Sequence, residues 1–209
     1  GIAIGNIIQG IPIGADKEYA GTTLDLFNPY AILVGITTVA LFMMHGCIYL
    51  SMKTEGYLQE MVESWVNNTI IFFVISYAAT TMATLIYFPH MAQPFKDNPA
   101  LFLVALLNML AIANIPREIH LKREFRAFLS SSISIALLMI LFAIGLFPNL
   151  VLSSINPGFN LTIYNAASSQ KTLGIMLIVA MIGLPFVATY TVSIYWIFRG
   201  KVKIDKMSY

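Results

Sequence analysis

The sequence is poor in charged residues and in cysteine. Asp, Glu, Lys and Arg together make up only 11% of the 209 residues, less than half of the roughly 25% found in soluble domains. The 12 Lys and Arg are nearly balanced by 10 Asp and Glu, so there is no basic face for phosphate groups, and we expect no nucleic-acid partner. The single cysteine, Cys47, excludes an internal disulfide and a cysteine-ligated metal or iron–sulfur centre.

Hydrophobic residues make up 58% of the chain, and the mean hydropathy is +0.77. Five runs without Asp, Glu, Lys or Arg are long enough to approach the thickness of a bilayer: residues 30–51, 69–88, 100–115, 127–147 and 173–198. The third run has 16 residues and covers only about 24 Å as a helix, so it needs flanking residues to cross. We therefore predict an all-α integral membrane protein, a single bundle of about five transmembrane helices over residues 1–209.

Proline positions predict where these helices begin and end. The Asn-Pro pairs at 28–29 and 98–99 place a side-chain acceptor before a proline in the first turn, which is typical of helix starts. Pro116 and Pro148 directly follow the third and fourth runs and predict helix ends. Pro185 lies inside the fifth run and predicts a kink.

Two further segments are apolar enough to contact the membrane. Residues 1–14, GIAIGNIIQGIPIG, have no basic region before them, so we interpret them as the end of a preceding helix and not as a signal peptide. Residues 52–68 mix apolar side chains with glutamates, and we interpret them as an interfacial helix that extends the first span.

The basic residues predict the orientation, because cytoplasmic loops collect Lys and Arg. If the loops alternate between two sides, one side holds Lys17, Lys96 and Lys171. The other side holds nine: Lys53, Arg117, Lys122, Arg123, Arg126, Arg199, Lys201, Lys203 and Lys206. We therefore expect the second side and the C-terminus to be cytoplasmic.

His45 is the one ionisable group inside a predicted span. A proton relay or a haem ligand is possible, but we favour a neutral histidine bonded to a neighbouring helix, because no span offers it a carboxylate partner. A haem held by this chain alone needs two axial ligands at one depth on facing helices, or one histidine with an open site. Neither His90 nor His120 matches His45 in position. Asn108 and Asn114 lie at membrane depth, where lipid offers no hydrogen-bond partner, so their side chains should face protein.

The order of several motifs resembles the second subunit of the bacterial cytochrome bd quinol oxidase. That family has a Gly-Asn-x-x-Gln-Gly-x-Pro stretch, then an Asn-Pro helix start, then a Tyr-Leu-x-Met-Lys/Arg-Thr-x-Gly exit. The matching positions are Gly5, Asn6, Gln9, Gly10, Pro12, Asn28, Pro29, Tyr49, Leu50, Met52, Lys53, Thr54 and Gly56. The resemblance continues in FPNLVLSSINPGFNLTIYNAASSQKTLGIM and in YTVSIYWIF, up to Tyr209. It covers the whole chain but only the C-terminal part of the family's subunit, so the family's N-terminal spans have no counterpart in this sequence.

The resemblance implies a membrane-bound complex that oxidises quinol and reduces O2 to water in the respiratory chain of the bacterial inner membrane. The haems and the quinol-oxidising loop would belong to a large partner subunit, and this chain would bind no haem alone. It would act as a scaffold in contact with lipid and quinone, with a structural quinone as a candidate ligand. No catalytic or metal-binding residue is assigned; Asn6, Gln9 and His45 are the polar candidates inside the membrane or at an interface.

Two other classes stay open. A small multi-span transporter should have paired broken helices around a polar site at the midplane, and only the run at 173–198 contains an internal proline. A truncated remnant that does not assemble would share the pattern of spans but lack a partner.

Overall fold

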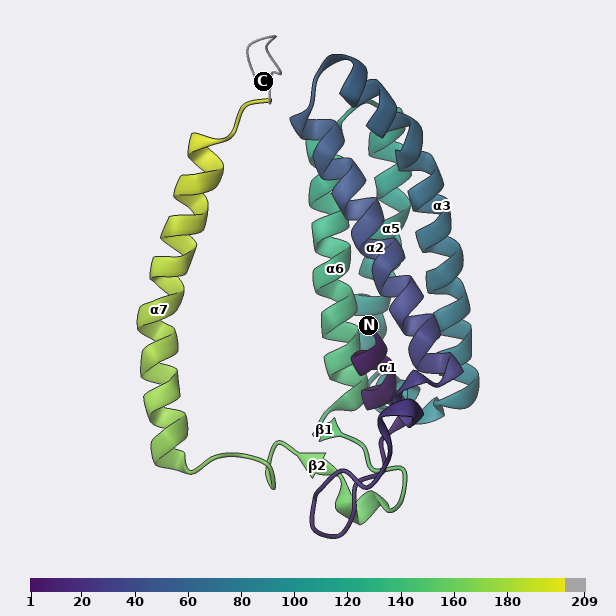
Figure 1. Cartoon of the computed structure of the whole chain (residues 1–209), viewed down its shortest axis with the longest axis vertical. Coiled ribbons are helices and arrows are strands. Elements are labelled where there is room, and N and C mark those ends of the chain that lie inside the picture. The colour runs from purple at the N-terminus through teal and green to yellow at the C-terminus, as the bar shows by residue number, and fades with distance from the viewer. Residues whose placement is uncertain (202–209) are drawn as a thin grey trace.

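The computed structural model describes residues 1–201, and helices dominate this part of the chain (Figure 1). The α-helices are α1 (Ile2–Gln9), α2 (Pro29–Lys53), α3 (Gly56–Tyr87), α4 (Gln93–Asp97), α5 (Phe102–His120), α6 (Glu124–Leu146) and α7 (Gln170–Ile197). Within residues 1–201, the 3-10 helices are η1 (Thr23–Phe27), η2 (Pro89–Ala92), η3 (Pro99–Leu101) and η4 (Pro157–Phe159), and the strands β1 (Asn149–Val151) and β2 (Leu161–Thr162) form a small antiparallel sheet. Five helices are long and apolar enough to cross a membrane: α2, α3, Pro99–His120, α6 and α7. The predicted all-α membrane fold is confirmed.

Capping explains where two of the spans begin. The Asn28 side chain accepts a hydrogen bond from the backbone N–H of Ala31 at 2.8 Å, and Pro29 is the first residue of α2. Asn98 accepts from the N–H of Ala100 at 3.2 Å in the same way, and η3 then leads into α5. Both acceptors satisfy helix N–H groups that have no partner in the first turn. The predicted starts are confirmed.

The predicted end of the third span at Pro116 is wrong. Helix α5 passes through Pro116 and ends at His120, so the membrane-crossing stretch is 22 residues long. Ile115 is fully buried and Ile119 packs against the same cluster, so the helix gains apolar contacts on both sides of the proline. Such gains offset the one backbone hydrogen bond that proline removes.

The prediction that residues 52–68 extend the first span is wrong, because most of them form the start of the second. The segment is helical, but it belongs to α3, which begins at Gly56, and not to α2, which ends at Lys53. Gly56 has a φ of +62°, a conformation that favours glycine and turns the chain between the two helices. Val62 and Val66 are buried four residues apart and continue the apolar stripe of the second span.

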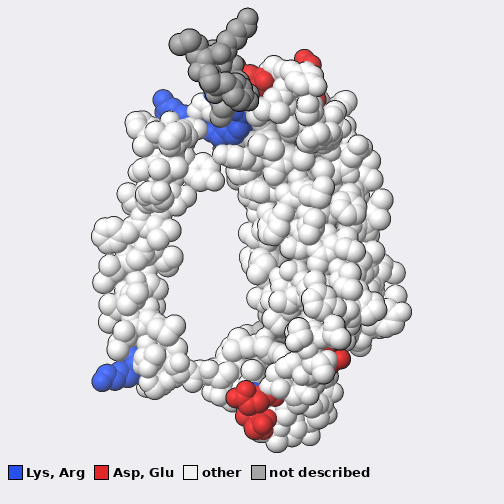
Figure 2. Space-filling view, viewed as in Figure 1, with Lys and Arg blue, Asp and Glu red and all other residues white. Residues whose placement is uncertain are grey.

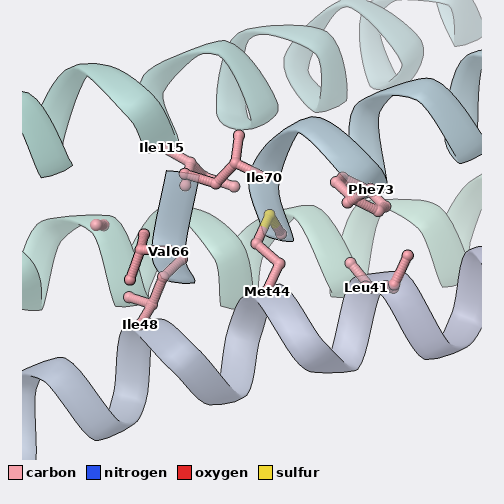
Figure 3. Close-up of a cluster of buried hydrophobic side chains, with 9 residues drawn as sticks. Leu41, Met44, Ile48, Val66, Ile70, Phe73 and Ile115 are labelled. Atoms are coloured by element: carbon pink, nitrogen blue, oxygen red, sulfur yellow. The ribbon is translucent and has the colours of Figure 1, made fainter. Parts of the chain in front are cut away.

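Helices α2, α3, α5 and α6 pack into a four-helix bundle around one apolar cluster (Figure 3). The labelled side chains are Leu41, Met44 and Ile48 from α2, Val66, Ile70 and Phe73 from α3, and Ile115 from α5. Met44, Ile48, Phe73 and Ile115 are completely buried. In a membrane these side chains exchange contact with lipid for contact with protein, so they stabilise the bundle through close van der Waals packing. The bundle therefore has a core of its own.

Charged side chains gather at the two ends of the molecule. In Figure 2, Lys, Arg, Asp and Glu lie at the top and bottom of the visible face, and the middle carries none. We call the end that holds Lys53, Lys122 and Glu124 the basic end, and the end that holds η1, η2 and the sheet the sheet end. An uncharged belt between two polar ends is the pattern of a membrane-spanning bundle.

Helix α7 stands apart from the bundle in Figures 1 and 2. Its most apolar stretch, with a mean hydropathy of 2.2, has no residue buried inside the structure. At the basic end the Lys53 ammonium donates a hydrogen bond to the carbonyl of Phe198 at 2.7 Å. The helix continues on both sides of Pro185, and the kink expected there stays a prediction. Within residues 1–201, α7 is therefore tied to the bundle through its ends.

The sheet end is a layer built from two distant segments. Helix α1 stops at Gly10, whose φ is +90°, which agrees with the interpretation of the N-terminal segment as a helix end. Just beyond it, Ile11 exchanges backbone hydrogen bonds of 2.9 Å with Leu152 and Ser154. The ammonium of Lys17 also donates to the carbonyl of Gly158 at 2.9 Å. These bonds fasten the N-terminal segment to the loop that leads to α7.

Candidate functional site

Asn6 is the centre of a buried hydrogen-bonded cluster near the sheet end. Its amide nitrogen donates to the carbonyls of Ile2 at 2.9 Å and Leu26 at 2.8 Å. Its amide oxygen accepts from the side-chain nitrogen of Asn28 at 2.9 Å. Asn6 is only 6% exposed, so these bonds replace the water that a buried amide loses. Its partners lie on α1, on η1 and at the start of α2, which indicates a packing role.

The loop beside this cluster holds an ordered carboxylate. Asp25 accepts a hydrogen bond of 2.7 Å from the backbone N–H of Thr22. This bond, together with one from the Thr22 side chain, lowers the pKa of Asp25 below its usual value because it favours the charged form. The carbonyl of Asp25 also accepts from the Asn28 amide at 3.4 Å. The short turn η1 is thereby held against the start of α2.

Gln9 does not belong to the Asn6 cluster. Its side chain is exposed, and the part of the chain that the structure covers offers it no hydrogen-bond partner. His45 is remote from both candidates: it lies 16 residues after the start of α2 at Pro29, or about 24 Å along the helix. The structure therefore does not bring the three candidates together into one site.

His45 is bonded to a neighbouring helix. Its Nδ1 lies 2.8 Å from Oγ of Ser131 on α6, and its ring stacks on Phe128 with centroids 4.9 Å apart. Ser131 donates its one hydroxyl hydrogen to the carbonyl of Phe128 at 2.8 Å. Its oxygen therefore accepts from Nδ1–H of His45, which fixes the tautomer of the ring. The geometry agrees with the histidine that we favoured from the sequence.

Asn108 and Asn114 face protein, as predicted. Asn108 is fully buried; its Oδ1 accepts from Oγ of Ser134 at 3.1 Å, and its Nδ2 donates to the hydroxyl of Tyr77 at 3.1 Å. Asn114 donates from Nδ2 to Oγ of Ser130 at 2.9 Å. Interhelical bonds of this kind hold membrane helices together. They join α5 to α3 and α6.

Glu118 is a buried carboxylate that sequence reasoning missed. It is only 3% exposed; its Oε1 lies 3.2 Å from Nη1 of Arg117, and its Oε2 has no hydrogen-bond partner within residues 1–201. The predicted end at Pro116 had placed this residue in a loop. The signal that could have found it is the helical spacing of Asn114 and Glu118, four residues apart on one face.

A polar cavity of about 230 Å³ lies at the basic end. Its charged and polar lining residues are Ser51, Glu63, Asn67, His120, Lys122 and Glu124. The ammonium of Lys122 donates to Glu63 at 2.6 Å. This hydrogen bond and the negative charge of Glu63 raise the pKa of Lys122, so the ammonium form is favoured.

The three histidines are not placed as an axial pair for a haem. Two axial ligands must approach one iron from opposite sides. His45 on α2 is bonded to Ser131 on α6, whereas Nε2 of His90 lies 3.1 Å from the carbonyl of Ile8 at the sheet end. His120 lines the cavity at the opposite, basic end. Within residues 1–201 no group of three or more His, Cys, Asp and Glu residues is placed to hold a metal ion.

These features define a class of protein: a multi-pass α-helical membrane protein whose interior polar side chains mainly bond helices to one another. The particular family follows from comparison with known proteins. The family model for cytochrome bd terminal oxidase subunit II matches residues 1–198. The chain belongs to this family, as the motif order suggested.

Curated relatives show the same similarity. Cytochrome bd-I ubiquinol oxidase subunit 2 of Escherichia coli (strain K12) is 26% identical over 232 residues, covering 97% of this chain and 61% of the relative. Cytochrome bd ubiquinol oxidase subunit 2 of Bacillus subtilis is 28% identical, with 97% and 59% covered. A probable cytochrome oxidase subunit 2 of Haemophilus influenzae is 26% identical, with 99% and 63% covered. The chain thus spans about three fifths of the length of these relatives.

Proposed function

We propose that this chain is a non-haem scaffold subunit of a cytochrome bd-type terminal oxidase. The complex would oxidise quinol and pass the electrons to O2, which is reduced to water at haems on a large partner subunit. The observation that carries the proposal is the family match over residues 1–198. The scaffold role is supported by His45 and Asn108, whose polar atoms bond neighbouring helices instead of converging on an open ligand position.

The exposed apolar surface supports a large membrane partner. Helix α7 has bilayer length and no residue of its apolar stretch buried against the bundle, and Figure 2 shows open space between the two in this view. A membrane subunit that works alone packs its helices against each other, because only contact with protein fixes their tilt and rotation. We infer that a partner subunit and lipid cover this surface.

The transporter alternative has less support. A substrate site at the midplane is expected between paired broken helices, whereas α2, α3, α6 and α7 are each continuous over their length. Prolines lie inside α5 at Pro116 and inside α7 at Pro185, and each helix continues through its proline without a break. A remnant that does not assemble remains the other alternative, and purification tests it.

The test is co-purification in mild detergent from the native membrane, followed by a visible absorption spectrum. We expect a haem-bearing partner to accompany the tagged chain, and the complex to oxidise quinol with consumption of O2. The chain separated from its partner should show no haem absorbance. Haem absorbance from the separated chain would contradict the proposal, and the absence of any partner would favour the transporter or the remnant.

Orientation in the bacterial cytoplasmic membrane is part of the proposal. We expect the basic end and the C-terminus to face the cytoplasm, because nine of the 12 basic residues fall on that side. In cells, Lys96→Cys should react with a thiol reagent that does not cross membranes, and Ser208→Cys, which lies outside the described residues, should be protected. Cys47→Ser supplies the background. The opposite labelling pattern would contradict this orientation.

His45 provides a further prediction about the assembled complex. His45→Gln should leave quinol oxidase turnover within a few-fold of the original value, because the ring donates one hydrogen bond to Ser131 and packs on Phe128. Loss of that bond should lower stability by about 1 kcal/mol. Turnover and thermal inactivation of the same preparation check both expectations. Abolished turnover in a fully assembled complex would restore the proton-relay interpretation.

A further inference from the structure

The interface of α5 with α6 and α3 contains a line of polar groups, and one of them, the carboxylate of Glu118, is not needed to bond the helices to one another. We call this line the polar seam; it consists of Glu118, Asn114, Ser130, Ser134, Asn108 and Tyr77. It begins with a carboxylate near the basic end and ends at a phenol in the interior of the bundle. Bonding between helices alone requires only amides and hydroxyls, as at Asn108.

Glu118 is the unusual member of the seam. Its side chain is 97% buried, since only 3% is exposed, yet Oε2 has no partner within residues 1–201. Burial of a carboxylate oxygen without a hydrogen bond is costly, so this atom requires a proton or a water molecule. Solvent is near, because the paired Arg117 side chain is 68% exposed.

The spacing of the seam allows water to link its members. Asn114 lies one helical turn before Glu118, and Nη1 of Arg117 bridges them with bonds of 3.1 Å to Asn114 and 3.2 Å to Glu118. Ser130 and Ser134 are one turn apart on α6. Residues four apart on a helix have Cβ atoms about 5–6 Å from each other. One bridging water can span such a gap.

The hydrogen-bond directions leave two hydroxyl hydrogens available. Ser130 accepts from Nδ2 of Asn114, and Tyr77 accepts from Nδ2 of Asn108. Neither hydroxyl has an acceptor for its own hydrogen among residues 1–201, whereas Ser134 donates to Oδ1 of Asn108. The amides therefore orient the hydroxyls, and the hydroxyls can exchange protons with water.

A cavity lies near the first end of the seam, and a second one is lined by its last member. At the basic end, the cavity of about 230 Å³ is lined by the neighbouring turns of α5 and by Glu63, His120, Lys122 and Glu124. At the other end, Tyr77 lines a cavity of about 330 Å³ together with the hydroxyl-bearing Thr80, Thr81 and Thr84. A water molecule occupies about 30 Å³ in the liquid, so the polar cavity at the basic end has room for ordered water. The cavity at Tyr77 is lined mostly by apolar side chains, and its hydroxyl groups are those of Tyr77 and the three threonines. The seam thus runs from the neighbourhood of a cavity that can hold water to hydroxyl groups in the interior of the bundle.

We propose that the polar seam conducts protons from the basic end into the membrane interior, with Glu118 as the group that first accepts them. This inference rests on the proposed function, because reduction of O2 to water consumes protons. A proton from solvent forms an O–H bond on Glu118, and that bond breaks as the proton passes to water beside Ser130. From there the proton moves along hydroxyl groups and ordered water: each hydroxyl or water oxygen that gains a proton releases another, while the amides of Asn114 and Asn108 orient these groups and carry none. One proton thus reaches the hydroxyl of Tyr77 for each that enters, and no electron moves along the seam.

The test uses the assembled complex in detergent. Glu118→Gln should reduce quinol oxidase turnover at least tenfold and enlarge the solvent deuterium isotope effect on turnover, while Glu118→Asp restores part of the rate. Tyr77→Phe and Ser134→Ala should each reduce turnover several-fold with the same isotope signature. Matched controls are Glu60→Gln, an exposed glutamate on α3, and Ser132→Ala, whose hydroxyl donates only to the carbonyl of Phe128 within residues 1–201.

The isotope effect separates proton transfer from structure. Unchanged turnover of assembled Glu118→Gln overturns the inference and leaves the proposed function intact; so does slower turnover without a larger isotope effect, which indicates a structural role. If Glu118→Gln fails to assemble, the same two criteria are applied to Tyr77→Phe and Ser134→Ala. If the original complex oxidises no quinol, the proposed function fails and the inference fails with it.

Discussion

Gly5→Ala should destabilise the chain by about 2–3 kcal/mol, because overpacking of a tight contact forces backbone shifts. A Cβ atom added at Gly5 would lie 2.6 Å from Cα of Ala31 and 3.2 Å from Cβ of Val34. The nearest of these atoms is backbone and cannot rotate away, so α1 must move off α2. Thermal unfolding of the detergent-solubilised protein measures the change.

The same substitution at Gly46 is the matched control. A Cβ atom at Gly46, in the middle of α2, would meet no atom within 4 Å. Gly46→Ala should therefore raise helix stability by about 0.5–1 kcal/mol, because glycine loses more backbone freedom than alanine. Equal stability of the two variants would show that α1 does not pack against α2 as described.

Asn6→Leu should lower the free energy of unfolding by about 3 kcal/mol, since it removes a buried amide and leaves its half-buried partners without their hydrogen bonds. The carbonyl of Leu26 and the side-chain amide of Asn28 both lose their bonds to Asn6. Leucine has the same branched shape as asparagine, but its methyl groups need more room than the amide atoms, which lie 2.8 and 2.9 Å from Leu26 and Asn28, so steric strain adds to the loss. Denaturant or thermal unfolding gives the difference.

Gln9→Leu is the companion variant on the same helix. Because Gln9 is exposed, its replacement should change stability by no more than about 0.5 kcal/mol. Asn6 and Gln9 belong to one sequence motif, so this comparison separates a residue that holds the fold from one that does not. A large loss at Gln9 with little loss at Asn6 would contradict the observed hydrogen bonds.

The spans could be predicted from the sequence because bilayer thickness and proline chemistry act locally. The Asn-Pro pairs at 28–29 and 98–99 begin helical segments as expected. The end of α5 could not be predicted in the same way, since the burial of Ile115 and Ile119 against other helices carries the helix through Pro116. Tertiary contacts outweigh a local helix-breaking signal there.

Among the polar residues, the sequence indicated which groups need partners but not which partners they find. His45 was expected to bond a neighbouring helix, yet Ser131 lies 86 residues away in the chain, and such a pairing depends on how the helices pack. Glu118 was missed because the predicted helix end at Pro116 placed it in a loop, whereas α5 continues to His120 and buries it. The motif containing Asn6 and Gln9 indicated the family, whereas only the structure showed that one is buried and the other exposed.

The attachment of α7 to the bundle has a consequence for the shape of the subunit. The Lys53 ammonium at the end of α2 interacts favourably with the negative, C-terminal end of the α7 helix dipole. No residue in the apolar stretch of α7 is buried against the bundle. The attachments at its two ends set the distance of α7 from the four-helix bundle, but no contact between these ends fixes the tilt of α7 or its rotation about its own axis. That final adjustment is set by the molecules that surround the helix.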